Sequence, residues 1–190
     1  MKWLTSAIAV VLLASAPLRA QTPPPAQAGK PGGLDEFSEL MAKYAALRGD
    51  LEKTIAPLTG RDDPAGVVAF EDSLAEKVRG ARAKARQGDL FTPAASEAFR
   101  KILREMDALS WRIIMDVNPG QFPQRVNDSY PRDKPLSTMP PDLLARLPRL
   151  PEGVQYRFVG STLILHDIKT NLVIDRLPEA IPISAPPRRR

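Results

Sequence analysis

The chain has 190 residues, with no cysteine, one histidine and a formal charge of +5 from 27 basic and 22 acidic residues. Without cysteine it can form neither disulfides nor cysteine-based metal sites, so its stability must come from a packed core. Lys2 and Arg19 lie in the N-terminal segment, and without them 25 basic residues face 22 acidic ones, a difference matched by the three arginines at 188–190. The body of the protein is therefore neutral, which argues against nucleic-acid binding.

The first twenty residues, MKWLTSAIAVVLLASAPLRA, begin with Lys2 and continue into an apolar run too short to span a bilayer. They predict a signal peptide over 1–20, cleaved after Ala20, with a retained N-terminal anchor as the alternative. No later stretch is apolar enough to cross a membrane. We therefore expect a protein that is exported to the periplasm or secreted, with a disordered linker at 21–33 and a disordered basic tail at 183–190.

A single domain is expected over 34–182. Apolar residues at helical spacing predict helices at about 35–58, 64–87, 93–117 and 141–147. The short link between the first two helices predicts an antiparallel hairpin. The third helix begins with the N-cap and proline pair Thr92-Pro93. Its inward face is expected to carry Phe99, Ile102, Leu103, Met106, Leu109, Ile113 and Val117.

The stretch QFPQRVNDSYPRDKPLSTMPP is rich in proline and turn residues and shows no helical or strand period. Such a long segment without its own secondary structure needs support from the domain. We expect it to lie along the helices, held there by Phe122, Val126 and Tyr130.

Three strands are predicted at about 154–159, 162–167 and 172–177. Gly160-Ser161 suits a two-residue type II′ turn, and Asn171 suits a left-handed position in the next turn. These turns pair Phe158 with Leu163 and Ile164 with Asp175 in an antiparallel meander. One face should be apolar and pack on the helices, with Val154, Tyr156, Phe158, Leu163, Leu165, Leu172 and Ile174. The other should be mixed and meet water or a partner, with Gln155, Arg157, Thr162, Ile164, His166, Val173 and Asp175.

On the mixed face, His166 and Asp175 would be diagonal neighbours with Arg157 nearby, an arrangement that could serve acid-base chemistry or hold an anion. An exposed face with ordinary charge pairs is the competing interpretation. Asp167 would point to the opposite face and cap the turn.

Arg79, Arg82 and Arg86 fall on one arc of the second helix. They could bind phosphate or acidic polymers, but a solvated helix face is the favoured interpretation, because no aromatic residues are interleaved for base stacking. The sequence contains no nucleophile elbow, phosphate loop or zinc motif, and the pair Asp62-Asp63 has too few neighbouring oxygen ligands for calcium. No metal or cofactor is expected.

The segment from Leu147 to Pro182 contains a Leu-Pro repeat, Tyr156-Arg157, Gly160, and two apolar runs that end in Asp167 and Asp175. In this, and in residues 127–148, it resembles an uncharacterised family of exported bacterial proteins. The resemblance covers about a third of the chain and implies bacterial export, but no activity.

The sequence therefore predicts an α+β fold, with helices followed by a three-stranded meander. For function it favours a non-catalytic binding or assembly protein of the cell envelope, with a protein partner recruited to an outer strand by β-augmentation. The alternative is a small hydrolase or an anion- or small-ligand-binding enzyme that uses Arg157, His166 and Asp175.

Overall fold

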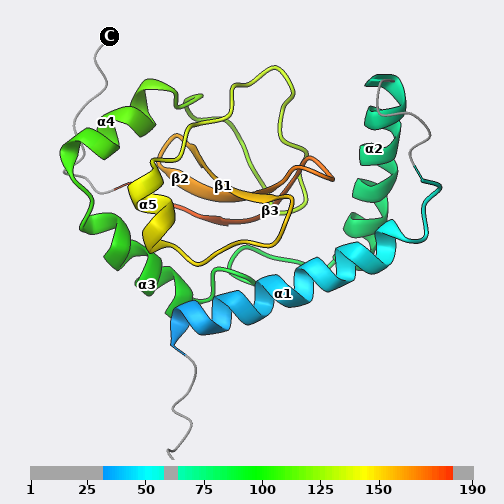
Figure 1. The fold of residues 1–190 in the computed structure, drawn as a ribbon, viewed down its shortest axis with the longest axis horizontal. Coiled ribbons are helices and arrows are strands. Elements are labelled where there is room, and N and C mark those ends of the chain that lie inside the picture. Colours follow the sequence, from blue (N-terminus) through cyan, green and yellow to red (C-terminus); the bar gives the residue numbers. More distant parts are fainter. Residues whose placement is uncertain (1–31, 58–63, 182–190) are drawn as a thin grey trace, which may run out of the picture.

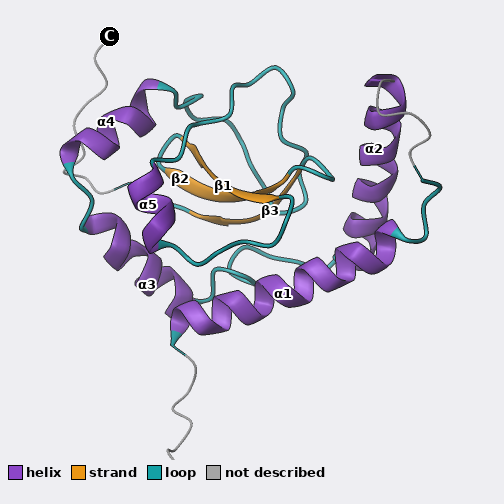
Figure 2. Ribbon diagram, viewed as in Figure 1, coloured by secondary structure: helices purple, strands orange, loops and turns teal. Residues whose placement is uncertain are grey.

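The computed structural model describes residues 32–57 and 64–181 and confirms an α+β fold, with helices followed by an antiparallel sheet of order β1-β2-β3 (Figure 1). Around the sheet the helices lie in the order α2, α1, α3 and α4, and a long loop connects α4 to α5 (Figure 2). The elements are α1 (Gly33–Glu52), α2 (Pro64–Ala81), α3 (Pro93–Arg104), α4 (Ala108–Asp116), α5 (Pro141–Arg146), β1 (Val154–Val159), β2 (Thr162–Asp167) and β3 (Leu172–Leu177).

The predicted signal peptide, most of the predicted linker and the basic tail lie outside the described residues. So does the pair Asp62-Asp63. Within the described ranges, no helix has both the length and the apolar character needed to cross a membrane. The linker was expected to reach Gly33, but this residue begins α1 and lies so close to the Ala94 carbonyl that a Cβ there would overlap it.

The β1–β2 hairpin has the predicted register, from Val154 opposite Asp167 to Val159 opposite Thr162. Gly160 has φ +58°, as the first central residue of a type II′ turn requires. The side-chain amide of Asn118 fixes this turn, because it donates to Gly160 O (2.8 Å) and accepts from Gly160 N (2.9 Å).

The second hairpin departs from the predicted register. His166 pairs with Val173 as expected, but an irregularity follows, and Asp175 lies opposite Leu165 rather than opposite Ile164. The additional residue in β3 is a β-bulge, which shifts the rest of the strand by one position. Asp175 consequently lies on the helix-facing side of the sheet and not on the predicted polar face.

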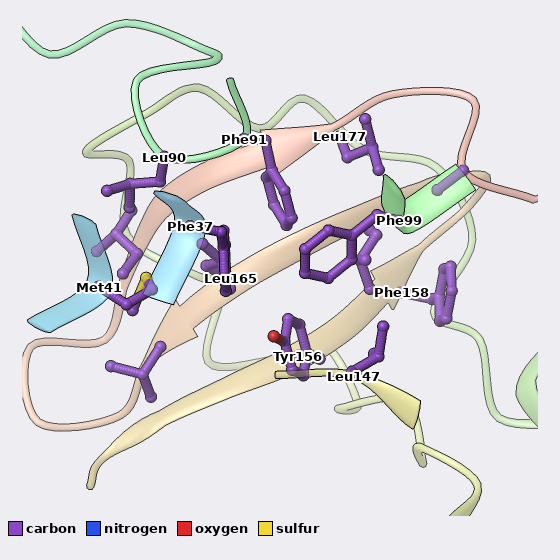
Figure 3. Close-up of a cluster of buried hydrophobic side chains, with 14 of the residues drawn as sticks. Phe37, Met41, Leu90, Phe91, Phe99, Leu147, Tyr156, Phe158, Leu165 and Leu177 are labelled. Atoms are coloured by element: carbon purple, nitrogen blue, oxygen red, sulfur yellow. The ribbon is translucent and has the colours of Figure 1, made fainter. Parts of the chain in front are cut away.

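The predicted apolar face is confirmed. All seven of its residues belong to one buried cluster with side chains from the helices. Its centre is aromatic, since Phe99 lies 4.9 Å from Phe37, 5.1 Å from Phe91 and 5.8 Å from Tyr156 between ring centroids (Figure 3). Burial of these large rings provides much of the apolar stabilisation that a chain without disulfides needs.

The expected third helix is two helices. α3 ends at Arg104, and Asp107 caps α4 by accepting hydrogen bonds from Ser110 N (2.8 Å) and Ser110 Oγ (2.9 Å). The break rotates the second segment, so that Trp111 and Ile114 face the core. Three residues predicted to point inward are exposed instead, namely Leu109 (56%), Ile113 (41%) and Val117 (40%).

The first two helices do not form the expected antiparallel hairpin. Figure 1 shows α2 rising at a steep angle near the C-terminal end of α1. α2 also ends at Ala81, before the predicted position 87, because the chain turns at Arg82 to reach the sheet.

Residues 118–140 cover the second face of the sheet, and part of the segment also contacts a helix as expected, since Arg79 of α2 donates to Asn127 O and Arg132 pairs with Glu71 of α2. Phe122 and Tyr130 hold this cover segment in place as predicted, but the surface beneath them consists of Ile164, Val173 and Val159. The predicted mixed face therefore carries an apolar group, Val159, Ile164 and Val173, and the cover segment removes it from water.

Candidate functional site

His166 lies under the cover segment and is only 4% exposed. Its Nε2 is 3.0 Å from Asn171 Oδ1, and its ring centroid is 5.1 Å from that of Tyr130. Its buried Nδ1 has no hydrogen-bond partner among the described residues. Burial lowers the pKa of His166 below its ordinary value. The imidazole is thus neutral and enclosed.

We expect His166 to make stability depend on pH. Because its pKa is lower in the folded protein than in the unfolded chain, its contribution is complete above about pH 6.5 and is lost as the pH falls below that value, by up to about 1.4 kcal/mol per pH unit. His166→Gln should reduce the fall in unfolding free energy between pH 7.5 and 5.5, measured by urea denaturation. As the only histidine, His166 also gives one imidazole signal in NMR, and titration at or above pH 6.5 would contradict the expectation.

The predicted His166–Asp175 pair does not form, because the bulge places the two side chains on opposite faces. Asp175 is 0% exposed and accepts backbone hydrogen bonds from Gly88 (3.0 Å), Leu90 (2.7 Å) and Phe91 (2.8 Å). Burial raises the pKa of Asp175, and these hydrogen bonds oppose the rise. The carboxylate therefore organises the turn before α3.

Arg79 and Arg82 form hydrogen bonds within the fold, so they are not part of a free cationic surface. Arg79 donates to Asn127 O (3.0 Å) and Ser129 Oγ (2.6 Å). Arg82 donates to Ile174 O (2.9 Å) and lies 5.1 Å above the Tyr44 ring. Arg86 is exposed beyond the end of α2, so the three arginines do not share a helix face.

Asp167 does cap its turn as predicted, by accepting from Lys169 N (3.0 Å). It is also the centre of a buried network that the sequence did not indicate. Arg48 on α1 donates to Asp167 Oδ1 (3.0 Å) and to Glu152 O (2.6 Å), and the Tyr44 hydroxyl donates to Asp167 Oδ2. Both Asp167 (0%) and Arg48 (5%) are buried, so this network connects α1 to the sheet and is closed to a ligand.

One open concavity does lie beside the sheet. A groove of about 670 Å³ follows the outer side of β1, within the usual size range of ligand sites. Its walls are residues 136–139 of the cover segment, Leu144 of α5, residues 148–150, and residues 154–157 of β1.

The backbone of β1 faces this groove at alternate residues. Val159 and Thr162 flank a two-residue turn and form a hydrogen-bonded pair, after which bonded and non-bonded pairs alternate along the hairpin. Val154, Tyr156 and Phe158 therefore direct their N–H and C=O groups away from β2.

The protein itself occupies both ends of this edge. Val154 N donates to Pro151 O (3.1 Å), and Phe158 N donates to Ser137 Oγ (2.7 Å). Between them, the outward backbone groups of Tyr156 bond to no residue that the structure describes. A stretch of unpaired strand edge thus lies on the groove wall.

The opposite edge of the sheet is paired over the first half of β3. Asn127 N donates to Val173 O (2.8 Å), Val173 N donates to Asp128 O (2.9 Å), and Tyr130 N donates to Asn171 O (2.8 Å). The sequence suggested that both outer strands could offer an edge, but the first half of β3 is paired with the cover segment.

The rims of the groove are apolar and its charges are of one sign. Leu136 (42% exposed) and Leu144 (46% exposed) lie on its walls. Of the lining residues within 32–57 and 64–181, only Arg149 and Arg157 are charged. Sequence reasoning identified Arg157 alone among these four residues. The other walls come from segments that meet only in the folded protein.

Among the described residues, no three or more histidine, aspartate or glutamate side chains gather in a way that could hold a metal ion. Comparisons with known proteins found no matching family model, curated protein or solved structure. The resemblance to exported bacterial proteins thus stays an expectation.

Proposed function

We propose that this protein is a non-catalytic binding protein, exported to the periplasm or secreted, that receives an extended polypeptide segment as an additional strand along β1. The observation that carries the proposal is the unpaired edge at Tyr156, which lies on the wall of the groove. Backbone hydrogen bonds to an exposed edge provide affinity in β-augmentation, and pockets for alternate side chains provide specificity.

The surroundings of Tyr156 fit such a ligand. On the helix-facing side of β1, Met139 belongs to the apolar core and Leu150 packs against it. These two residues would contact every second side chain of the ligand. The exposed leucines Leu136 and Leu144 give the ligand further apolar surface, which a protein without a partner at this site would leave in water.

Hydrogen exchange tests the proposal directly. In the free protein the outward amide of Tyr156 should exchange faster than that of Arg157, which bonds to β2. Peptides selected from a random library on the full chain should slow exchange at Tyr156 at least tenfold and leave exchange at Arg157 unchanged.

A matched pair of variants locates the binding surface. Leu144→Asp should weaken binding of the selected peptides at least tenfold, whereas Leu109→Asp, at a leucine on α4 that is somewhat more exposed, should not. Peptides that bind without protecting Tyr156, or a library that yields no binder, would overturn the proposal.

A further inference from the structure

The charges that line the groove allow an inference beyond the recognition of an extended backbone. Arg149 and Arg157 lie in its lining, which among the described residues contains no aspartate, glutamate or lysine. Neither arginine forms an ion pair with a carboxylate of the described residues, whereas Arg48, Arg100, Arg132 and Arg146 each do so.

Arg157 needs a counter-charge more than Arg149 does, because Arg157 is half-buried whereas Arg149 is exposed. Its guanidinium donates to Ser137 O (2.8 Å) and to the Gln155 side-chain oxygen, and its buried Nε has no partner among the described residues. Both partners are neutral. A guanidinium that is partly removed from water without a counter-charge is costly, and a carboxylate nearby would offset that cost.

The position of Arg157 also determines which residues of a ligand strand should carry a carboxylate. Side chains alternate along β1, so Tyr156 points to the apolar helix-facing side and Arg157 points to the other side. A ligand strand beside β1 has the same alternation. Its residues next to Tyr156 meet Met139 and Leu150, and the residues between them face Arg157.

We propose that the ligand is an acidic extended segment in which apolar residues alternate with aspartate or glutamate. This inference rests on the proposed function and names the chemistry of its partner. The carboxylates pair with Arg157 and Arg149, and the apolar residues contact the helix-facing wall of the groove.

The composition of library-selected peptides gives the first test. Aspartate and glutamate should be enriched at every second position, and lysine and arginine should be depleted there. The best peptide and its isosteric Asp→Asn or Glu→Gln analogue are then compared by fluorescence titration at low and at high salt. The acidic peptide should bind at least tenfold more tightly at low salt, and this advantage should shrink at high salt.

Protein variants assign the effect to the two arginines. Arg157→Gln and Arg149→Gln should each reduce the advantage of the acidic peptide, whereas Arg112→Gln, at an exposed arginine of α4, should leave it unchanged. Arg149 is exposed, so its variant serves even if Arg157→Gln perturbs folding.

The outcomes separate the two proposals. If acidic and amide peptides bind equally well and both protect the Tyr156 amide, the charge inference fails and the strand-binding function stands. If no peptide protects Tyr156, both fail. If inorganic phosphate or acetate alone binds at millimolar concentration with the same dependence on arginine, and peptides bind no better, the site is a small-anion site and the inference is overturned.

Discussion

Replacing Asp167 with Ala should lower the free energy of unfolding by about 3–5 kcal/mol, the usual cost of removing one member of a buried ion pair. The change would leave the Arg48 guanidinium, which is only 5% exposed, without its carboxylate. It would also leave the Tyr44 hydroxyl without its acceptor. Equilibrium denaturation in urea measures the loss.

A second substitution sharpens this expectation. Arg48→Met in the Asp167→Ala background removes the buried unpaired charge, so the double variant should be more stable than Asp167→Ala alone. Asp133→Ala is the control, since that carboxylate is 75% exposed although it also forms an ion pair, and it should change stability by less than about 0.5 kcal/mol. If Asp167→Ala is as mild as the control, the network does not hold α1 on the sheet.

Arg48 shows how far sequence patterning reaches. Phe37, Met41, Tyr44 and Arg48 follow one another at spacings of four, three and four residues, which places all of them on one helix face. The helical period thus contained the position of Arg48, but a charged side chain is ordinarily expected to face solvent. Burial of an arginine becomes understandable only when Asp167, more than a hundred residues away, supplies the opposite charge.

The strands were predictable because the turn residues and the alternation of apolar and polar side chains indicated the same pairing. Gly160 at a positive φ and Asn171 at φ +53° define both turns, and each turn sets a register. The bulge was missed because the register was continued regularly past His166. The spacing of Ile174 and Leu177 did indicate it, since two residues three apart cannot both face the core in a regular strand.

The break between α3 and α4 was missed for a related reason. Apolar residues continue at intervals of three and four through Met106, so periodicity alone favours a single helix. A local signal indicated the break instead. Asp107 is followed three residues later by Ser110, and an aspartate at such a position can cap a new helix. The groove beside β1 could not have been predicted by either route, since its walls are brought together by tertiary packing.

Asp175 leads to the second large effect. Asp175→Ala should lower the free energy of unfolding by about 3–5 kcal/mol, since each buried N–H that loses its acceptor costs about 1–3 kcal/mol. The amides of Leu90 and Phe91 would lose the carboxylate of Asp175, to which both donate. Asp175→Asn keeps one acceptor oxygen and should fall between Ala and the wild-type protein.

The position of this turn gives the substitution a consequence beyond the lost hydrogen bonds. Phe91 follows the turn directly and stacks on Phe37 at 5.4 Å, so the carboxylate that holds the turn also positions one ring of the aromatic core. Hydrogen exchange should therefore show faster exchange at Leu90 and Phe91 in Asp175→Ala under native conditions, while the β1 amides that bond to β2 stay protected. If these two amides keep their protection, the turn is held by its packing, and the carboxylate is not what organises it.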